Sequence, residues 1–549
     1  MTKYIITACL SLVLWNIYGQ SDGNFNFWVE SHMQYYVDDE VTGDFTEEDR
    51  FRSNNYFNVD YAIKGFTFGL QLEGYAPQHL LNFSPNYDKD INLGLYYARY
   101  KGKKFNVSLG HFYEQYGNGL ILRSWEDRQL GLNNALMGLN ALYNISDNTR
   151  LSVMAGKQRI GFKLSDGLLT GVNLEHDVNN FLKHENYSAN FGLSYVGRYE
   201  KPDNVADDFE PMTHAFSGRY QLIFDNFYTG AEYALKTKDV LVENQTIIED
   251  KSFYGNAFQL NMGYSQKGLA MNATFRRLEN MKFYTDRRQT GNTYNESIVN
   301  YLPALTRQHD YSLSNIYVYQ AQPALQFSPL EKAGEIGGQF DIFYKIKKKT
   351  ALGGKYGTKL SFNASTWYGL GADYVPDYKR VDVGFLDFGE HYFSDFSLEI
   401  RKKFSRKLSG IFTAIHTDYN KKYIEESSGK IHANIFIAES TLKLKSLSSL
   451  RLEVSHLSTK QDKKNWAGST LEWNINSNFS VFATDIYNYG NDDPNHRDHY
   501  YLIGGSYSKN KTRIALNYGR QRGGVLCVGG VCREVPAATG LTIDLTTSF

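Results

Sequence analysis

The feature that most restricts what this chain can fold into is a period-two alternation of apolar and polar residues along its length. In residues 66–73 every second side chain is phenylalanine or leucine, and most of the others are polar. Segments 340–346, 360–365 and 449–454 repeat this pattern. Successive side chains of a β-strand point to opposite faces, so each segment has one apolar face and one polar face. No long window shows the 3.6-residue period of an amphipathic helix, and the sequence therefore predicts an all-β protein.

The alternating segments are about 10 to 13 residues long, whereas strands of globular proteins usually have about 5 or 6 residues. A tilted strand needs about 9 to 11 residues to cross a bilayer. Short connections occur at 64–65, 101–103, 225–226, 265–267, 405–406, 476–477 and 509–510. Longer polar connections occur at 77–89, 199–213, 239–252, 370–390 and 420–429.

Short turns on one side and long loops on the other are typical of outer-membrane barrels, whose short turns are periplasmic. The sequence therefore predicts an integral, antiparallel outer-membrane β-barrel of about 24 strands, with about 22 to 26 allowed and both termini periplasmic. A secreted β-solenoid or a soluble all-β array is the alternative, and the chain lacks the fixed repeat period that a solenoid needs.

Composition excludes several other classes for this 549-residue chain. Its 59 Lys and Arg balance its 59 Asp and Glu, which argues against a nucleic-acid partner because such binding needs a basic excess. After residue 20 no uncharged apolar run is long enough for a transmembrane helix. The 42 Tyr and 35 Phe argue against disorder. Only 10 Pro and no linker-like tract favour one continuous architecture over several domains.

The first 19 residues have the pattern of a secretory signal peptide. Lys3 supplies the positive start, a short apolar stretch runs from Ile5 to Trp15, and Gly19 precedes a plausible cleavage point. We therefore expect residues 20–549 to form a single transmembrane barrel. Its first strand begins within about ten residues of the cleavage point, which leaves no space for a separate plug domain.

The last strand ends on an aromatic residue, Phe549, which shares one face with Leu541, Ile543 and Leu545. This ending resembles the C-terminal aromatic assembly signal of bacterial outer-membrane barrels. The resemblance implies that the barrel-insertion machinery and outer-membrane lipid are partners of the chain.

Three further stretches carry a wider resemblance: Phe112 to Arg123, Asn300 to Tyr311, and Cys527 to Arg533. They are similar to an uncharacterised outer-membrane barrel family of Bacteroidota that has only a domain-of-unknown-function label. The resemblance implies a barrel and an outer-membrane address, but no activity.

The segment 280–333 is by far the longest connection, and structureless loops of that length are usually functional. A barrel of about 24 strands encloses a wide lumen, so this segment would constrict the pore if it folds inward. It could equally lie across the rim as a surface loop, and the sequence leaves both readings open. Candidate pore-lining residues in it are Arg287, Arg288, Arg307, His309 and Asp310.

A second polar cluster contains Arg123, Glu126 and Arg128, and Arg276 is an inward-facing charge on a strand. Because the expected inward charges have mixed signs, we expect weak selectivity between anions and cations. The same residues could instead pair with each other across strands.

Cys527 and Cys532 are the cysteines that remain after signal removal, and they fall in an expected extracellular loop between the last two strands. A turn through Val-Gly-Gly-Val makes a local disulfide geometrically easy, and the compartment is oxidising. We favour a disulfide over a redox or metal pair, because no third or fourth metal ligand is nearby.

Passage of polar solutes, narrowed or gated by residues 280–333, is the function that the sequence favours. The alternative is an occluded structural or assembly barrel that binds another envelope protein. A lipid-active hydrolase comes third, because His456 and Ser458 resemble the His-x-Ser of outer-membrane phospholipase, with Asn465 as a possible orienting group. Ser458 is followed by Thr459-Lys460 rather than Asn-Gly-Arg, so the resemblance is partial. No phosphate loop, dinucleotide fingerprint or zinc spacing occurs, and we expect no enzyme activity, cofactor or metal.

Overall fold

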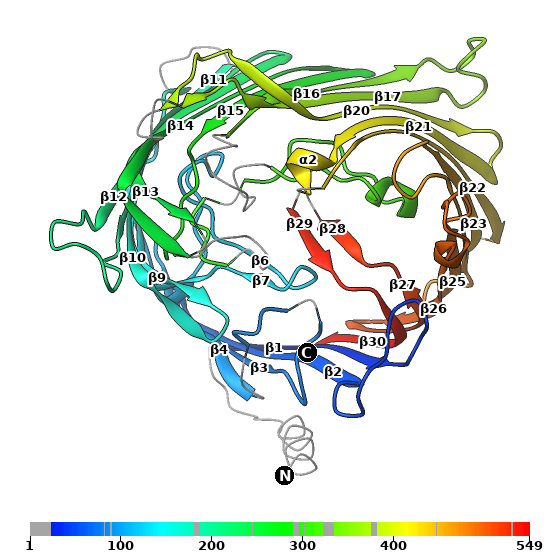
Figure 1. The fold of residues 1–549 in the computed structure, drawn as a ribbon, viewed down its shortest axis with the longest axis horizontal. Helices are drawn as coiled ribbons and strands as arrows, with labels where there is room; N and C mark the ends of the chain where they lie inside the picture. The colour runs from blue at the N-terminus through cyan, green and yellow to red at the C-terminus, as the bar shows by residue number, and fades with distance from the viewer. Residues whose placement is uncertain are drawn as a thin grey trace.

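The computed structural model is one closed ring of β-strands around several infolded segments (Figure 1). The structure describes residues 23–81, 83–87, 91–179, 187–243, 245–288, 296–300, 302–321, 334–374, 381–425, 427–445, 447–528 and 531–549. No helix in the described part of the chain is both long and apolar enough to span a membrane.

The wall of the ring consists of 24 antiparallel strands. They are β1 (Asn24–Tyr36), β2 (Phe51–Ile63), β3 (Phe66–Gly74), β4 (Ile91–Lys101), β5 (Phe105–Phe112), β8 (Leu136–Ser146), β9 (Thr149–Ile160), β10 (Lys163–Asp177), β11 (Tyr187–Tyr199), β12 (Met212–Phe224), β13 (Phe227–Glu243), β14 (Thr246–Gln266), β15 (Leu269–Glu279), β16 (Gly334–Ile346), β17 (Thr358–Leu370), β20 (Phe388–Lys403), β21 (Leu408–Asn420), β22 (Lys430–Lys445), β23 (Ser448–Ser458), β24 (Trp466–Asn474), β25 (Phe479–Tyr487), β26 (His499–Lys509), β27 (Thr512–Gln521) and β30 (Ala538–Ser548).

Short elements lie outside the wall within the described residues. They are the strand pairs β6 (Glu126–Asp127) with β7 (Leu132–Asn133), β18 (Asp373–Tyr374) with β19 (Val381–Asp382), and β28 (Gly524–Val528) with β29 (Val531–Val535), the helix α2 (Lys421–Ile424), and the 3-10 turns η2 (Ser312–Asn315) and η5 (Pro494–His496).

Each wall strand pairs with the next wall strand along the chain, and β1 pairs with β30 to close the ring. In this closing pair Trp28 lies opposite Ser548 and Tyr36 lies opposite Gly540. His32 Nδ1 and Asp544 Oδ1 are 2.6 Å apart across the seam. Both described ends of the chain therefore lie at the same end of the barrel, and the prediction of a barrel of about 24 strands is confirmed.

The outer face of the wall is apolar and the inner face is largely polar, the reverse of a water-soluble sandwich. On β3 the side chains of Phe66 and Phe68 are 45% and 48% exposed, whereas the inward Gln71 and Glu73 are buried. Exposed Leu452 and Val454 repeat the arrangement on β23. An outer face of this kind is typical of barrels that cross a membrane.

One predicted long loop is wrong, because residues 239–252 belong almost entirely to β13 and β14. The pairing continues through Leu241 opposite Ile248 and Val242 opposite Ile247, and it ends in a tight turn near Gln245. The polar residues of this stretch suggested a loop, but its β-branched side chains favour an extended hairpin.

Several connections from the end opposite the termini fold into the ring, and Figure 1 shows β6, β7, β28 and β29 inside it. The β28–β29 hairpin places Cys527 directly opposite Cys532 in the backbone register. The side chains of these two cysteines lie outside the described residues, so the disulfide stays a prediction.

Candidate functional site: the lumen and its infolded segments

The residues that occupy the lumen come mainly from two parts of the chain. We call residues 280–288, 296–300 and 302–321 the lumen segment, and residues 113–135 the inner loop. Both follow wall strands at the end opposite the termini, and both contact the inner face of the wall. The inner loop begins after β5 and the lumen segment after β15.

The first half of the lumen segment packs on an apolar area of the inner wall. Phe283 and Val299 belong to one buried cluster with Leu120 and Ile121 of the inner loop. The wall contributes small or aliphatic residues from successive strands, namely Leu169, Val196, Ala215, Ala234, Ala257 and Leu278. Burial of one large aliphatic or aromatic side chain contributes about 1.5–3 kcal/mol, so this cluster stabilises the closed arrangement substantially.

The second half of the lumen segment packs on later strands of the ring, beginning with β17 and β20, through aromatic residues. The Tyr319 ring stacks 5.9 Å from Trp367 and 5.2 Å from Phe393, measured between centroids. Tyr319 also donates a hydrogen bond to Glu335 Oε2 at 2.6 Å. Leu313 is completely buried in the same cluster. The segment therefore follows the inner wall from the strands of the first cluster to β23 and β24, which η2 contacts.

Arg276, on wall strand β15, binds the middle of the lumen segment. Its Nη2 donates to Glu335 Oε1 at 2.8 Å, and its Nη1 donates to the carbonyl oxygen of Pro303 at 2.9 Å. The guanidinium lies 5.3 Å from the Trp367 ring centroid. Arg276, a predicted pore-lining residue, is 1% exposed, and its side chain binds the backbone of the lumen segment.

Arg287 is the most heavily bonded side chain of the lumen segment. Its Nε donates to Asp239 Oδ1 at 3.0 Å, and its Nη1 donates to Glu200 Oε2 at 3.2 Å. Its backbone N–H donates to both Glu200 carboxylate oxygens at 3.1 Å. The neighbouring Arg288 bonds the backbone carbonyl of Asp203 through its side chain. Since Arg287 is buried, removal of its charge leaves two buried carboxylates with one cation fewer.

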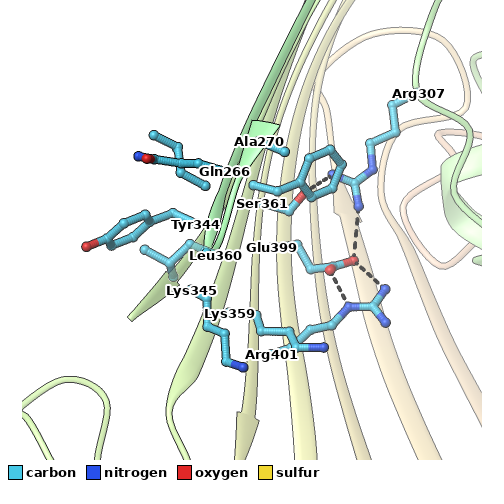
Figure 2. Close-up of a pocket in the computed structure, with 13 residues that line it drawn as sticks. Gln266, Ala270, Arg307, Tyr344, Lys345, Lys359, Leu360, Ser361, Glu399 and Arg401 are labelled. Atoms are coloured by element: carbon cyan, nitrogen blue, oxygen red, sulfur yellow. Dashed lines mark hydrogen bonds and ion pairs between the residues drawn. The ribbon is translucent and has the colours of Figure 1, made fainter. Parts of the chain in front are cut away.

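Arg307 bridges the segment to β17 and β20 at a cavity of about 390 Å³. Its Nη1 donates to Ser361 Oγ at 2.6 Å, and its Nη2 donates to Glu399 Oε2 at 3.3 Å. Figure 2 shows Arg401 bound to the same Glu399 carboxylate. The predicted residue Asp310 is exposed.

His309 lies next to Arg307 and is half-buried. Its Nε2 has no hydrogen-bond partner among the described residues. Burial and then the Arg307 charge lower the pKa of His309 from 6.5 to about 4. The docked segment therefore favours the neutral imidazole.

The inner loop is held by Arg128 and by a backbone contact to the lumen segment. Arg128 donates to Glu30 at 2.5 Å, to Gln71 at 3.1 Å and to Glu126 at 3.1 Å. The Arg123 backbone N–H donates to the Val299 carbonyl at 2.8 Å.

Two stretches that carry the family resemblance therefore meet in the lumen. Arg123 forms a parallel bridge with Asn300, whose Nδ2 donates to the carbonyls of Leu120 at 3.0 Å and Met281 at 2.8 Å. Gly117 permits close approach to the wall, because a Cβ there would lie 2.4 Å from Glu232 Oε2. Glu232 Oε2 accepts the Asn118 backbone N–H at 2.7 Å.

Open space remains beneath the inner loop, in a polar cavity of about 350 Å³. Arg150, Glu175 and Arg219 supply its charges, and Asn118 and Asn261 supply amides. Arg219 pairs with Glu175 at 2.9 Å. This mixture of polar groups suits a hydrated polar solute better than an apolar one.

The sequence identifies several of these arginines, and it predicts Glu30, Glu73 and Glu399 as inward charges without their partners. It does not identify Glu200, Asp239 and Glu335, which bind Arg287 and Arg276. Glu73 and Arg159 form a fully buried bidentate pair, with contacts of 2.6 and 2.7 Å, although 86 residues separate them. Their inward positions follow from strand alternation, but the pairing requires the three-dimensional closure of the ring.

The hydrolase-like residues do not assemble into a triad. His456 Nε2 lies 2.6 Å from the Tyr489 hydroxyl, and Asn465 Oδ1 accepts the Thr459 backbone N–H at 3.0 Å. No hydrogen bond links Ser458 to His456 within the described residues. No group of three or more potential metal ligands occurs in the described parts of the chain.

The geometry defines a closed barrel of the transmembrane type, with several of its own connections folded into the lumen. The whole chain, residues 1–549, matches the model of the family of unknown function DUF6029, and the protein belongs to this family. No curated protein matches the chain.

Solved structures with a similar fold include the siderophore receptor PirA from Pseudomonas aeruginosa, with 8% identity and a TM-score of 0.44 over 96% of this chain and 80% of that chain. The copper transporter OprC has 9% identity and a TM-score of 0.40 over 96% and 81%. The PapC usher translocation pore has 8% identity and a TM-score of 0.40 over 96% and 99%. These likenesses are too distant to carry an argument about function.

Substitution Arg287→Ala should release the first half of the lumen segment from the wall. Breaking one member of a buried charge network typically costs about 3–5 kcal/mol. We expect faster amide hydrogen exchange in peptides covering 281–300, with unchanged exchange in the wall strands. Arg288→Ala is the matched control, because Arg288 bonds a backbone carbonyl rather than a buried carboxylate. Equal protection of 281–300 in both variants would contradict the anchoring role of Arg287.

Proposed function

We propose that this protein is an outer-membrane conduit for polar solutes that the lumen segment closes in the described state. The observation that carries the proposal is that side-chain contacts at Arg276, Arg287 and Arg307 hold this segment against the inner wall between β11 and β20. These ion pairs add to the apolar packing of the segment, and they can break and form again when it detaches and returns. The polar cavity of about 350 Å³ next to the inner loop supports a hydrated path.

The outer-membrane address is supported by the closed ring, its exposed apolar outer face and its short turns at the end with both termini. In this proposal both termini are periplasmic, the barrel-insertion machinery reads the end at Phe549, and lipid covers the outside. The resemblance of three sequence stretches favours a source in Bacteroidota.

The second candidate is an occluded structural barrel that binds another envelope protein. Extensive apolar packing on both sides of the lumen segment favours it, because such packing makes opening costly. A lipid-active hydrolase has less support, since His456 and Asn465 bond other groups.

Single-channel conductance in a planar bilayer tests the conduit directly. The comparison is the refolded wild type against a variant that lacks residues 285–325. We expect a silent or rarely opening wild type and a steadily open deletion variant, because the lumen segment fills the ring. The open variant should distinguish weakly between anions and cations, since inward charges have mixed signs.

Two other results of the conductance measurement would contradict the conduit or its closure. If both proteins stay closed although the deletion variant is folded, passage through the lumen is wrong and the structural barrel takes its place. If both conduct equally, the lumen segment does not close the path.

Acidification should open the channel through His309. Above pH 6.5 the imidazole is neutral whether the segment is docked or detached, so pH has no effect through this group. Between pH 6.5 and about 4 the detached form binds a proton that the docked form excludes, so docking weakens as pH falls. The expected result is rising open probability over this range in the wild type. His309→Gln should flatten that rise, and an unchanged pH profile in this variant would exclude His309 as its source.

A further inference from the structure

Basic residues are concentrated in one sector of the barrel end that carries the termini. Residues 343–359 contain six lysines, residues 400–407 contain five lysines and arginines, and residues 441–449 contain two lysines. None of these three stretches contains an aspartate or glutamate. We call these stretches the basic sector, which stands out in a chain whose net charge is zero.

The three stretches are neighbours in space. They cover the turns that join β16 to β17, β20 to β21 and β22 to β23, and these strands follow one another directly in the ring. With neighbouring strands about 4.8 Å apart, the six strands present a basic edge of about 24 Å.

Cations in this sector lie directly opposite each other on adjacent strands. Lys345 pairs in register with Lys359, and Lys359 pairs with Arg401. Like charges directly opposite each other destabilise a sheet. Within the described residues Arg401 is the one cation of the sector that bonds a carboxylate, and it shares Glu399 with Arg307. The opposed lysines Lys345 and Lys359 therefore do not stabilise each other.

The opposed cations face the lumen rather than the lipid. Ser361 and Glu399 contact Arg307 in the lumen, and strand alternation places Lys359 and Arg401 on that same face. Figure 2 shows Tyr344 and Leu360 on the other side of the sheet from Arg307. Exposed Leu442 and Leu444 occupy corresponding outward positions on β22. Lys345, Lys359 and Arg401 therefore point away from the lipid that would surround the barrel.

We infer that the basic sector is a docking surface for an acidic polypeptide segment of another envelope protein. An extended chain spans about 3.3 Å per residue, so roughly seven residues would follow the edge of about 24 Å. Carboxylates spaced along such a segment would compensate the opposed cations. This docking does not depend on whether the lumen conducts.

A twenty-residue oligoglutamate with a fluorescent label is the probe for this surface. Its binding to the full-length barrel in detergent micelles is measured by fluorescence anisotropy. The test variant combines Lys345→Gln, Lys359→Gln, Lys403→Gln and Lys443→Gln. The matched control combines Lys101→Gln, Lys103→Gln, Lys104→Gln and Lys509→Gln, which removes the same charge from other turns at the same end. Heat-modified gel mobility shows that each barrel is folded.

We expect the wild type to bind the probe and high salt to weaken the binding. The test variant should lose about tenfold in affinity and the control less than about twofold. Absence of binding by the wild type, or equal losses in both variants, would overturn the proposal.

The barrel in phosphatidylcholine nanodiscs, with and without phosphatidylglycerol, tests lipid as the occupant. If phosphatidylglycerol abolishes probe binding in the wild type, and Lys402→Gln prevents that effect, the basic sector binds lipid headgroups and the proposal is wrong.

Discussion

The rest of this structure depends on one geometric constraint, which is that a closed ring of 24 strands encloses more space than its wall side chains can fill. Water, a ligand or the chain itself must occupy that space. Here the chain supplies the lumen segment and the inner loop, and the inner wall is apolar where they pack and polar elsewhere. The apolar residues of the inner wall therefore lie where the lumen segment and the inner loop pack.

Buried guanidinium–carboxylate pairs give this closed state its geometry. Replacement of such pairs by apolar residues is often neutral or stabilising, so net stability alone does not explain Arg276–Glu335 or Arg287–Glu200. Paired charges do specify one register for a segment that otherwise contacts the wall through interchangeable aliphatic side chains. When one of these pairs breaks, an uncompensated charge stays buried. Partial detachment of the lumen segment is therefore unfavourable, which favours a transition between two defined states.

Much of the fold could be predicted from the sequence, because strand alternation and turn spacing are local signals. Residues 66–73 identify their own inward and outward faces without any knowledge of their neighbours. The prediction of a loop at 239–252 is wrong because its polar residues resemble a loop. Its β-branched side chains, such as Ile247 and Ile248, favour the observed hairpin. The site was predicted only in part. Arg287 and Arg307 are predictable because they lie in the longest connection, and strand alternation predicts Glu399 as an inward charge. Glu200 is far from Arg287 in sequence and gives no local signal, so its pairing could not be predicted.

The central claim is that residues 302–321 lie packed against the inner wall of the folded barrel. Thiol labelling tests it in a background with Cys527→Ser and Cys532→Ser. Leu313→Cys replaces a completely buried residue, and Asp310→Cys replaces an exposed residue three positions away. The structure predicts rapid reaction of a hydrophilic maleimide with Asp310→Cys and at least about a hundredfold slower reaction with Leu313→Cys, since packed side chains react only on local opening. Equal labelling rates at the two positions would contradict the docked segment and with it the occluded lumen.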